Sequence, residues 1–431
     1  MYKIHIRIIV LAGLIMLSNI AAAQVTQSPF TSRGIGDIKD LALIHNQAMG
    51  GIGISNGDYW YLNNKNPALL PYNSLTTFAA GLLMENRNIS NENATETTGG
   101  GALGYLATSF PIKPGIWTTS IGLAPYSNVN YSFTISDVQV LNQNPGSDTV
   151  TTNIIEAGSG GFSQVYWSNG VALNKHVFIG LRATYIFSSL ETEFSNTLQN
   201  SGDLISFTPV VRSRTSVSDF LFQGGIALNK DSVINNKLQV KFGATYDFAS
   251  EVSATKFEST NLTTRTADLT ITDTLRNDEG GNISLPWKLG LGLSLNNDQK
   301  WMIGVDFSYQ PWSEYKNFEG RNEGLEDSYN IGLGGSFTPD PSSVTSYFER
   351  VTYRLGFSYE NTPYVINGEQ VKDFGINFGW SLPVSRFSSL DMAFKYGRRG
   401  DVGDTLIEEE YFRFSLGVTF NDRWFIQRKY D

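Results

Sequence analysis

The 431-residue sequence predicts an all-β protein: a transmembrane antiparallel β-barrel of about 14 strands with an N-terminal hatch or plug. Three observations carry this prediction. Apolar and polar residues alternate with period two in segment after segment beyond residue 74. After the N-terminus no run of 18 apolar residues occurs, so a membrane-embedded chain can cross only as a closed barrel. The chain is also rich in aromatics (27 Phe, 20 Tyr, 8 Trp), and only 17% of its residues are charged.

The first 23 residues have the layout of a secretory signal peptide. Lys3 and Arg7 precede the apolar run 8–17, and the small residues 21–23 precede an expected cleavage after Ala23. The run is too short to span the roughly 30 Å core of a bilayer as an anchoring helix. The sequence therefore predicts export to the outer membrane of a Gram-negative type of envelope.

The barrel is expected to occupy residues 74–420. In 301–309 the side chains of Trp301, Ile303 and Val305 share one face and alternate with Met302 and Gly304. A soluble β-sandwich would also alternate, but its strands are usually only about 5–6 residues long. Charged residues on the second face would disrupt a sandwich core, whereas they suit a polar lumen. Fourteen strands are expected near 74–85, 101–111, 115–125, 161–173, 177–192, 214–228, 237–254, 284–296, 300–314, 326–338, 351–363, 370–382, 388–398 and 409–420.

The connections between these strands fall into two classes. Short polar links such as 113–114 and 174–175 fit periplasmic turns. Three longer stretches, 126–160, 193–213 and 255–283, are rich in Asn, Ser, Thr and Asp and are expected to be extracellular loops. An even number of strands then leaves both ends of the barrel on the periplasmic side.

Residues 24–73 do not alternate. A short helix is expected over Asp37 to Ala48, with Gly50 placed to end it. A disordered periplasmic leader is one interpretation. The apolar residues of the segment favour a compact hatch inside the barrel: Leu41, Leu43, Ile44, Met49, Ile52, Ile54, Trp60, Tyr61 and Leu62.

At this point the chain resembles the FadL-type outer-membrane transporters. The resemblance lies in the Gly-rich segment 48–53, the motif Asn66-Pro67-Ala68 and a first strand that opens at Leu75. It implies a fourteen-stranded barrel with a small N-terminal hatch. It also implies passive uptake of long-chain fatty acids or other hydrophobic compounds through a lateral opening.

In that family the opening lies at an inward kink of the third strand and faces the Asn-Pro-Ala segment. The resemblance therefore implies that Asn66, Pro67 and Ala68 shape the gate and that Gly122 and Pro125 are candidates for the kink. Glycine leaves room and proline removes a ladder donor. A turn at the end of a strand explains Gly122 and Pro125 equally well.

The chain continues past its last expected strand as a basic, amphipathic tail, residues 421–431. We expect a periplasmic tail whose Trp424 and Phe425 lie at the membrane interface. A polar group of residues that closes the barrel is the alternative.

The sequence gives little support for a catalytic site or a metal-binding site. The sequence has no Cys, which excludes thiolate sites, and after cleavage only His45 and His176 remain as histidines. No hydrolase, phosphate-loop or calcium-loop motif occurs. The net charge of −9 disfavours nucleic acid as a partner. We therefore predict a non-enzymatic protein without cofactor or metal.

Three functions fit these features. The first is passive uptake of a hydrophobic compound, with outer-membrane lipid and a hydrophobic small molecule as partners. The second is an accessory subunit of an outer-membrane protein-secretion or assembly complex, in which another outer-membrane protein is the partner; the tail and the polar loops favour it. The third is a general porin, which the hatch argues against.

Overall fold

The computed structural model describes residues 26–140, 149–200, 207–230, 238–264, 270–297 and 300–423. The expected signal peptide 1–23 and the tail residues Trp424 and Phe425 lie outside the described residues. Within them, no helix is both long and apolar enough to cross a membrane.

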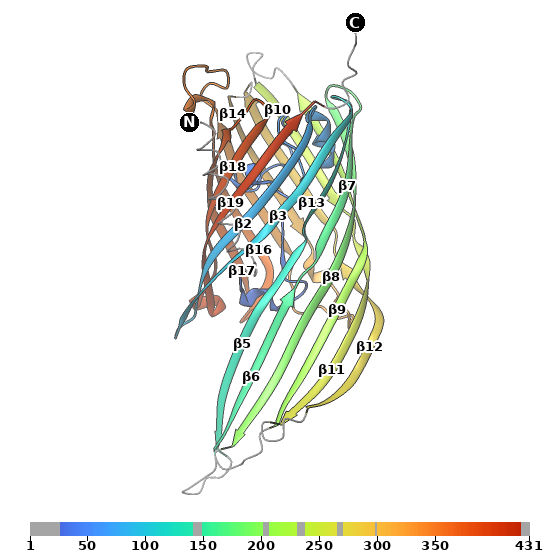
Figure 1. The fold of residues 1–431 in the computed structure, drawn as a ribbon, viewed down its shortest axis with the longest axis vertical. Coiled ribbons are helices and arrows are strands. Elements are labelled where there is room, and N and C mark those ends of the chain that lie inside the picture. The colour runs from blue at the N-terminus through green and yellow to red at the C-terminus, as the bar shows by residue number, and fades with distance from the viewer. Residues whose placement is uncertain are drawn as a thin grey trace, which may run out of the picture.

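Fourteen antiparallel strands form a closed ring, which confirms the predicted fourteen-stranded β-barrel (Figure 1). The ring closes where β19 pairs with β2 along the whole of Thr76–Ser90. In ring order the strands are β2 (Thr76–Ser90), β3 (Thr95–Lys113), β4 (Trp117–Pro125), β7 (Ser163–Ala172), β8 (Val177–Asn200), β9 (Phe207–Lys230), β10 (Leu238–Asp247), β13 (Lys288–Asn297), β14 (Trp301–Gln310), β15 (Ser328–Phe337), β16 (Thr352–Ile366), β17 (Glu369–Pro383), β18 (Ser388–Asp401) and β19 (Ile407–Asp422).

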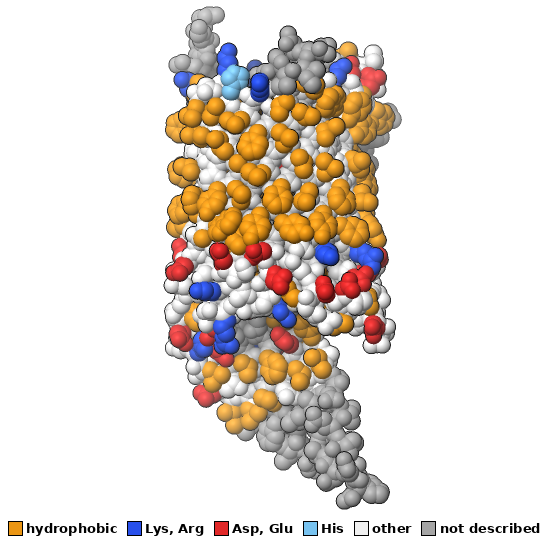
Figure 2. Space-filling model, turned by 180° about the vertical axis from the view of Figure 1, so that it is seen from behind, with side chains coloured by type: hydrophobic (Ala, Val, Ile, Leu, Met, Phe, Trp, Pro, Cys, Tyr) orange, Lys and Arg blue, Asp and Glu red, His pale blue; other side chains and the backbone are white. Residues whose placement is uncertain are grey.

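Alternation along each strand separates a lipid face from a lumen face. On β14, Ile303 is 54% exposed on the outside, whereas Asp306 is 4% exposed on the inside. Figure 2 shows the resulting belt of hydrophobic side chains around the barrel, bordered by a rim of charged side chains. Exposing such a belt to water would be energetically unfavourable. An outward-facing apolar band is the feature by which transmembrane β-barrels contact the lipid bilayer. An outer-membrane location follows.

Six strands continue beyond the charged rim as an open sheet, which we name the extracellular sheet (Figure 1). It runs in the order β5 (Ser127–Val140), β6 (Thr149–Gly160), the distal part of β8, the distal part of β9, β11 (Ser250–Thr264) and β12 (Thr270–Leu285). Strand β4 leads into β5 after Tyr126, and β12 leads into β13 after Pro286 and Trp287. Its assignment to the cell exterior follows from the short turns at the opposite end.

The prediction of loops at 126–160, 193–213 and 255–283 is therefore wrong, because the described residues of these stretches form strands of the extracellular sheet. Their Thr, Val and Ile residues have high β-propensity. Outside the bilayer neither face of a strand has to meet lipid, so the clean apolar–polar alternation that identifies a membrane strand is missing.

Residues 26–73 form the N-terminal segment, which lies within the barrel (Figure 1). It contains η2 (Pro29–Ser32), β1 (Asp37–Ile38), α2 (Ile44–Gln47) and η3 (Pro67–Tyr72). The expected helix over Asp37–Ala48 is thus only four residues long, because Asp37 and Ile38 instead pair with β5. Gly50 follows the helix at a φ of +71°, a conformation that favours glycine.

The largest apolar cluster joins the N-terminal segment to the base of the extracellular sheet. Phe30 and Ile35 of the segment pack with Phe162, Val217 and residues of the connection between β14 and β15, which contains η4 (Trp312–Glu314). Two other short helices lie in connections, η5 (Phe348–Arg350) and α3 (Val402–Thr405). The core of the molecule therefore lies in the lumen, around the N-terminal segment.

Candidate functional site

The Asn66-Pro67-Ala68 motif begins η3 and is fully buried. The Asn66 side chain caps the helix, because its Oδ1 accepts from the Ala68 N–H at 3.0 Å. Its Nδ2 donates to Ile54 O at 2.8 Å and to Ile226 O of β9 at 3.1 Å. Pro67 occupies the first turn, where its missing N–H leaves no donor unpaired. The motif thus links the N-terminal segment to β9.

Three glycines of the barrel wall, the wall glycines, lie in close contact with the motif. A Cβ built on Gly170 of β7 would lie 2.3 Å from Pro67 O, and one on Gly180 of β8 would lie 2.3 Å from the Pro67 carbonyl carbon. A Cβ on Gly225 of β9 would lie 2.2 Å from Asn66 Oδ1. The backbone can approach this closely only because these positions lack a side chain.

Charged lumen residues hold other parts of the N-terminal segment through its backbone. Asp306 of β14 accepts from the N–H groups of Gly53 at 2.8 Å and Ile54 at 2.9 Å. Lys241 of β10 donates to Gly57 O at 3.0 Å. Arg182 of β8 donates to the backbone oxygen of Asn64. Each contact satisfies a buried polar group, so the segment is fastened around much of the ring.

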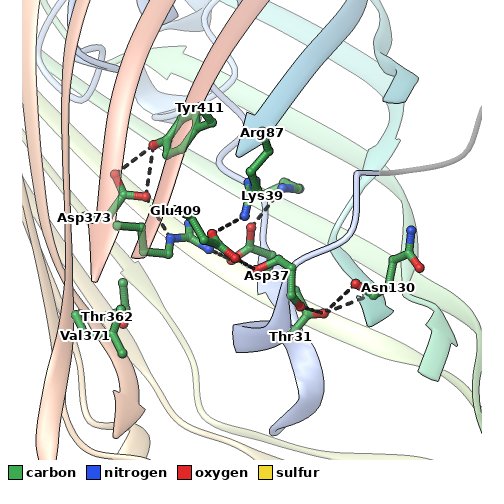
Figure 3. A network of polar contacts seen from close by, with 12 residues as sticks. Thr31, Asp37, Lys39, Arg87, Asn130, Thr362, Val371, Asp373, Glu409 and Tyr411 are labelled. Atoms are coloured by element: carbon green, nitrogen blue, oxygen red, sulfur yellow. Dashed lines mark hydrogen bonds and ion pairs between the residues drawn. The ribbon is translucent and has the colours of Figure 1, made fainter. Parts of the chain in front are cut away.

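A second set of contacts, the β1 network, fastens Asp37 to the opposite wall (Figure 3). Arg399 of β18 donates to Asp37 at 2.8 Å and to Asp373 of β17 at 2.9 Å. The Tyr411 hydroxyl of β19 donates to both oxygens of Asp373, at 2.7 and 3.0 Å. Lys39 lies 3.3 Å from Asp37.

The β1 network continues through Arg87 of β2. Arg87 donates to Glu409 of β19 and, at 2.6 Å, to Glu85. Glu409 also accepts from Ser28 Oγ of the N-terminal segment at 2.6 Å, and Glu85 accepts from Arg413 at 2.7 Å. Acidic and basic groups therefore alternate across four barrel strands and the segment.

A slit opens in the wall beside this network. The pairing of β3 with β4 ends at Leu106 and Leu123. Beyond that point the remaining part of β3 pairs with β2 alone, while β5 pairs with β6 and, at its start, with β1. The N-terminal segment crosses this slit along β5. A cavity of about 60 Å³ lies here, lined by Thr26, Ser28, Thr31, Asp37, Lys39, Leu83, Glu85, Arg87, Gly100, Gly101, Ala102, Asn128, Asn130 and Arg413.

The two residues singled out for a kink lie near the slit. Pro125 is the last residue of β4, and it lines a second cavity of about 170 Å³ together with Asp37 and Arg399. A Cβ on Gly122 would lie 2.2 Å from the Tyr166 hydroxyl, so this glycine makes room for an aromatic ring in the lumen. Asn66, Pro67 and Ala68 do not line either cavity but lie against β7, β8 and β9.

Many of the side chains that line these two cavities are charged or polar. In the described part of the chain, no group of three or more His, Cys, Asp or Glu side chains is arranged to hold a metal ion. His45 is buried and stacks on Tyr61 with ring centroids 4.2 Å apart, and the His176 ring lies at a turn, 3.0 Å from Asn229 O. The arrangement can therefore bind the main chain of the N-terminal segment and hold acidic and basic side chains in ion pairs.

The β1 network and the three wall glycines were not identified from the sequence. Inward-facing charges such as Asp306 and Lys395 are visible in the sequence as polar positions that alternate with apolar ones, but their partners are not. Glycine at lumen-facing positions of neighbouring strands is a signal that could have located the contact with Pro67. It needs the register between strands, which the sequence does not contain.

Comparison with known proteins agrees with this architecture. A sequence model of the BamG family matches residues 3–431. No curated protein sequence matches the chain.

Among solved structures, a Pseudomonas aeruginosa FadL homologue has a TM-score of 0.54 at 13% identity, with 93% of this chain and 99% of that chain covered. The P. putida toluene transporter TodX has a TM-score of 0.53 at 14% identity, with 92% and 100% covered. The CymD monoaromatic hydrocarbon channel has a TM-score of 0.53 at 14% identity, with 91% and 99% covered.

These three proteins are similar to the chain in fold. The expected resemblance to FadL-type barrels is confirmed at the level of fold. The match along the sequence identifies the family more directly: the chain belongs to the BamG family.

Proposed function

We propose that this protein is an accessory subunit of an outer-membrane protein-assembly or secretion complex. In this role it is not an enzyme. The barrel anchors the chain in the outer membrane, and the extracellular sheet contacts a partner protein. Membership of the BamG family along residues 3–431 supports this function over one inferred from fold likeness at 13–14% identity.

The observation that carries the proposal is an exposed apolar face on the extracellular sheet. Phe133, Ile135, Phe194 and Ile271 lie on the same face as Val129, which contacts the N-terminal segment at Gly36. Ile135 is 60% exposed, Phe194 43% and Ile271 56%. Figure 2 shows hydrophobic side chains gathered on this part of the molecule, separated from the membrane belt by the charged rim.

An apolar face in this place lies outside the bilayer. Burying one Phe or Ile side chain against a partner is worth about 1.5–3 kcal/mol, and exposed apolar side chains that gather on a protein surface commonly mark an interface. On this face they lie around the charged Glu156, which is placed between Phe133 and Phe194. Two of the lumen cavities are lined in part by charged side chains, among them Arg87 and Asp37, which form ion pairs.

The proposed organisation of the chain follows the sequence prediction. Residues 1–23 are a signal peptide, 24–73 are a hatch that closes the lumen, 74–420 are the barrel and 421–431 are a periplasmic tail. The tail would place Trp424 and Phe425 at the membrane interface. In an accessory subunit a closed lumen is useful, since the barrel then adds no leak to the membrane.

The test is purification of the tagged protein from its native envelope in mild detergent, followed by mass spectrometry of proteins and small molecules together. We expect a stoichiometric outer-membrane or periplasmic protein and no enriched hydrophobic compound. A stoichiometric hydrophobic compound without a protein partner would overturn the proposal.

A matched pair of variants tests the apolar face itself. Ile135→Asp should lower retention of the partner about tenfold or more, since it places a charge where an exposed apolar side chain would be buried against the partner. Ile155→Asp is the control, because Ile155 is 38% exposed on the opposite face of the same sheet. Equal losses from both variants would show that the apolar face has no special role.

The slit beside β3 favours a second candidate, passive uptake of hydrophobic compounds such as long-chain fatty acids through a lateral opening. In this function the gate would be shaped by Asn66, Pro67 and Ala68. The polypeptide would bend away from the barrel wall near Gly122 and Pro125 and so form the opening. The hydrocarbon channels that share the fold support it. The ligand would leave sideways into the membrane, driven by burial of its apolar surface.

A disulfide lock tests this second candidate. Ile38 of β1 lies directly opposite Ser127 of β5, and the natural chain has no Cys. The double variant Ile38→Cys/Ser127→Cys, once oxidised, should abolish uptake if the N-terminal segment has to move, and reduction should restore it. Retention of the partner should be the same in both states. Uptake that is unchanged by oxidation would contradict the channel mechanism.

A further inference from the structure

We infer that the free edge of β5, beyond Asn130, accepts an extended strand from the partner protein. The inference rests on the proposed function and specifies how the partner binds: by adding a strand to the extracellular sheet through main-chain hydrogen bonds. Figure 1 shows β5 at one edge of that sheet.

The N-terminal segment already uses the first part of this edge. Lys39 N donates to Tyr126 O at 2.9 Å, and Asp37 pairs with Asn128. Ser28 N donates to Asn130 O at 2.9 Å, and Asn130 N donates to Thr31 Oγ1 at 3.2 Å. The edge of β5 therefore binds extended backbone as far as Asn130.

The direction of the next main-chain groups follows from Asn130. In an antiparallel strand successive residues direct their N–H and C=O groups to opposite sides. Register with β6 is unbroken from Val129 to Val140. Because Asn130 directs both groups away from β6, the N–H and C=O groups of Ser132, Thr134 and Ser136 do the same. No strand in the described part of the chain pairs with them.

The opposite edge of the sheet is built differently. Strand β12 carries Asp273, Arg276, Asp278 and Glu279, its register with β11 shifts twice, and Asp278 has a φ of +49°. Charges and bulges of this kind keep other strands from pairing with an edge. In contrast, β5 carries no charged residue from Ser127 to Ser136. The edge of β5 is therefore the one suited to pairing with a strand of the partner.

The side chains that flank this edge define the partner strand. Phe133 and Ile135 lie on the apolar face, whereas Ser132 and Thr134 lie on the other face. A complementary strand is about five or more residues long, and places apolar residues beside Phe133 and Ile135 and polar residues beside Thr134.

A second copy of this chain does not fit. An antiparallel β5–β5 pair requires a two-fold axis perpendicular to the strands. That axis would place one of the two barrels upside down in the membrane. With antiparallel pairing between the β5 edges of two copies excluded, we assign the edge to a segment of a different protein.

Residue-resolved hydrogen exchange on the protein purified with its partner tests the inference. The isolated chain, separated from the partner, is the reference. We expect the amides of Ser132, Thr134 and Ser136 to exchange about 100-fold or more slowly in the complex. The amides of Tyr131 and Phe133 bond to β6 and should be slow in both states. Docking through side chains alone would not slow exchange at every second amide in this way.

Two variants at one position separate the main chain from the side chain. Thr134→Pro removes the outward N–H and should lower retention of the partner at least tenfold. Thr134→Val keeps that N–H and a β-branched side chain, and retention should stay within about twofold. Both should show the heat-modifiable migration of a folded barrel.

The outcomes separate this inference from the proposed function. If no protein is retained in stoichiometric amount, the proposed function and the inference fail together. If a partner is retained but the Ser132 and Thr134 amides exchange as fast as in the isolated chain, only the inference is overturned. Slow exchange of these amides in the isolated chain would point to pairing between copies and would also overturn it.

Discussion

Glycine at lumen-facing positions sets how closely the N-terminal segment can approach the wall. Gly224 and Gly225 are neighbours on β9, yet their surroundings differ. A Cβ on Gly225 would meet Asn66 Oδ1 at 2.2 Å, whereas a Cβ on Gly224 would meet nothing within 4 Å. Strand alternation directs Gly225 to the lumen and Gly224 to the outside.

This difference gives a matched prediction. Gly225→Ala should destabilise the protein by about 1–3 kcal/mol, because the added methyl group overpacks the contact with Asn66. Gly224→Ala should be nearly neutral. Thermal unfolding in detergent measures both, and equal midpoints for the two variants would contradict the close contact.

Arg399 is the centre of the β1 network, since it holds carboxylates from two separate parts of the chain. Its side chain is 8% exposed and pairs with Asp37 and Asp373. The neighbouring Arg398 points the other way, is 39% exposed, and pairs with Asp401 and Glu408. Removal of a buried partner leaves unpaired charge, which costs far more than loss of a surface pair.

We therefore expect Arg399→Ala to cost about 3–5 kcal/mol and to release the N-terminal segment. Arg398→Ala should cost about 0–1 kcal/mol. Limited proteolysis that detects cleavage near Asp37, together with thermal unfolding, distinguishes the two. If Arg399→Ala were as protease-resistant as the parent protein, the network would not hold the segment in place.

At the scale of elements, the connection between β14 and β15 is tied to the extracellular sheet by Glu319. This carboxylate accepts from Lys256 Nζ at 3.0 Å and from Arg276 Nη1 at 2.9 Å. The hydrogen bond from Lys256 is the largest cause that holds the pKa of Glu319 below its usual 4.5. The connection therefore depends on the ionised form of Glu319.

The sign of the pH dependence follows. A carboxyl whose pKa is lower in the folded state stabilises it above the unfolded pKa, and this contribution is lost as pH falls through the folded value. Proteolysis of residues 311–327 by an acid-active protease should accelerate as pH falls below about 4.5. Glu319→Gln should be cleaved faster at neutral pH and show little further acceleration. A variant with the parent's pH profile would rule out this role.

At the scale of the molecule, we expect the two ends of the barrel on opposite sides of the outer membrane, with the extracellular sheet outside the cell and the short turns in the periplasm. Thr192 lies on β8 within the extracellular sheet, whereas Lys175 lies in the turn between β7 and β8 at the opposite end. A membrane-impermeant maleimide should label Thr192→Cys on intact cells. It should reach Lys175→Cys only after the outer membrane is opened. The reverse pattern would invert the topology.

The barrel could be predicted from the sequence because its signal is local. Each lipid-facing strand has to alternate with period two, as 301–309 and 412–420 do, whatever its neighbours are. The position of the Asn66-Pro67-Ala68 motif just before the first strand was also visible in the sequence. The extracellular hairpins were not recognised, since the bilayer imposes no pattern on strands that leave it.

The remaining features of the site depend on contacts between residues that are far apart in the sequence. Asp37 and Arg399 are 362 positions apart, and they meet because β1, which pairs with β5, lies within hydrogen-bonding distance of Arg399 on β18. Likewise, β5 is a free edge only because β4 leaves the wall beside β3, and Gly225 faces Asn66 only in one register of the ring. Period-two alternation is a property of one strand in a bilayer, whereas ion pairs, edges and close backbone contacts are properties of the register between strands.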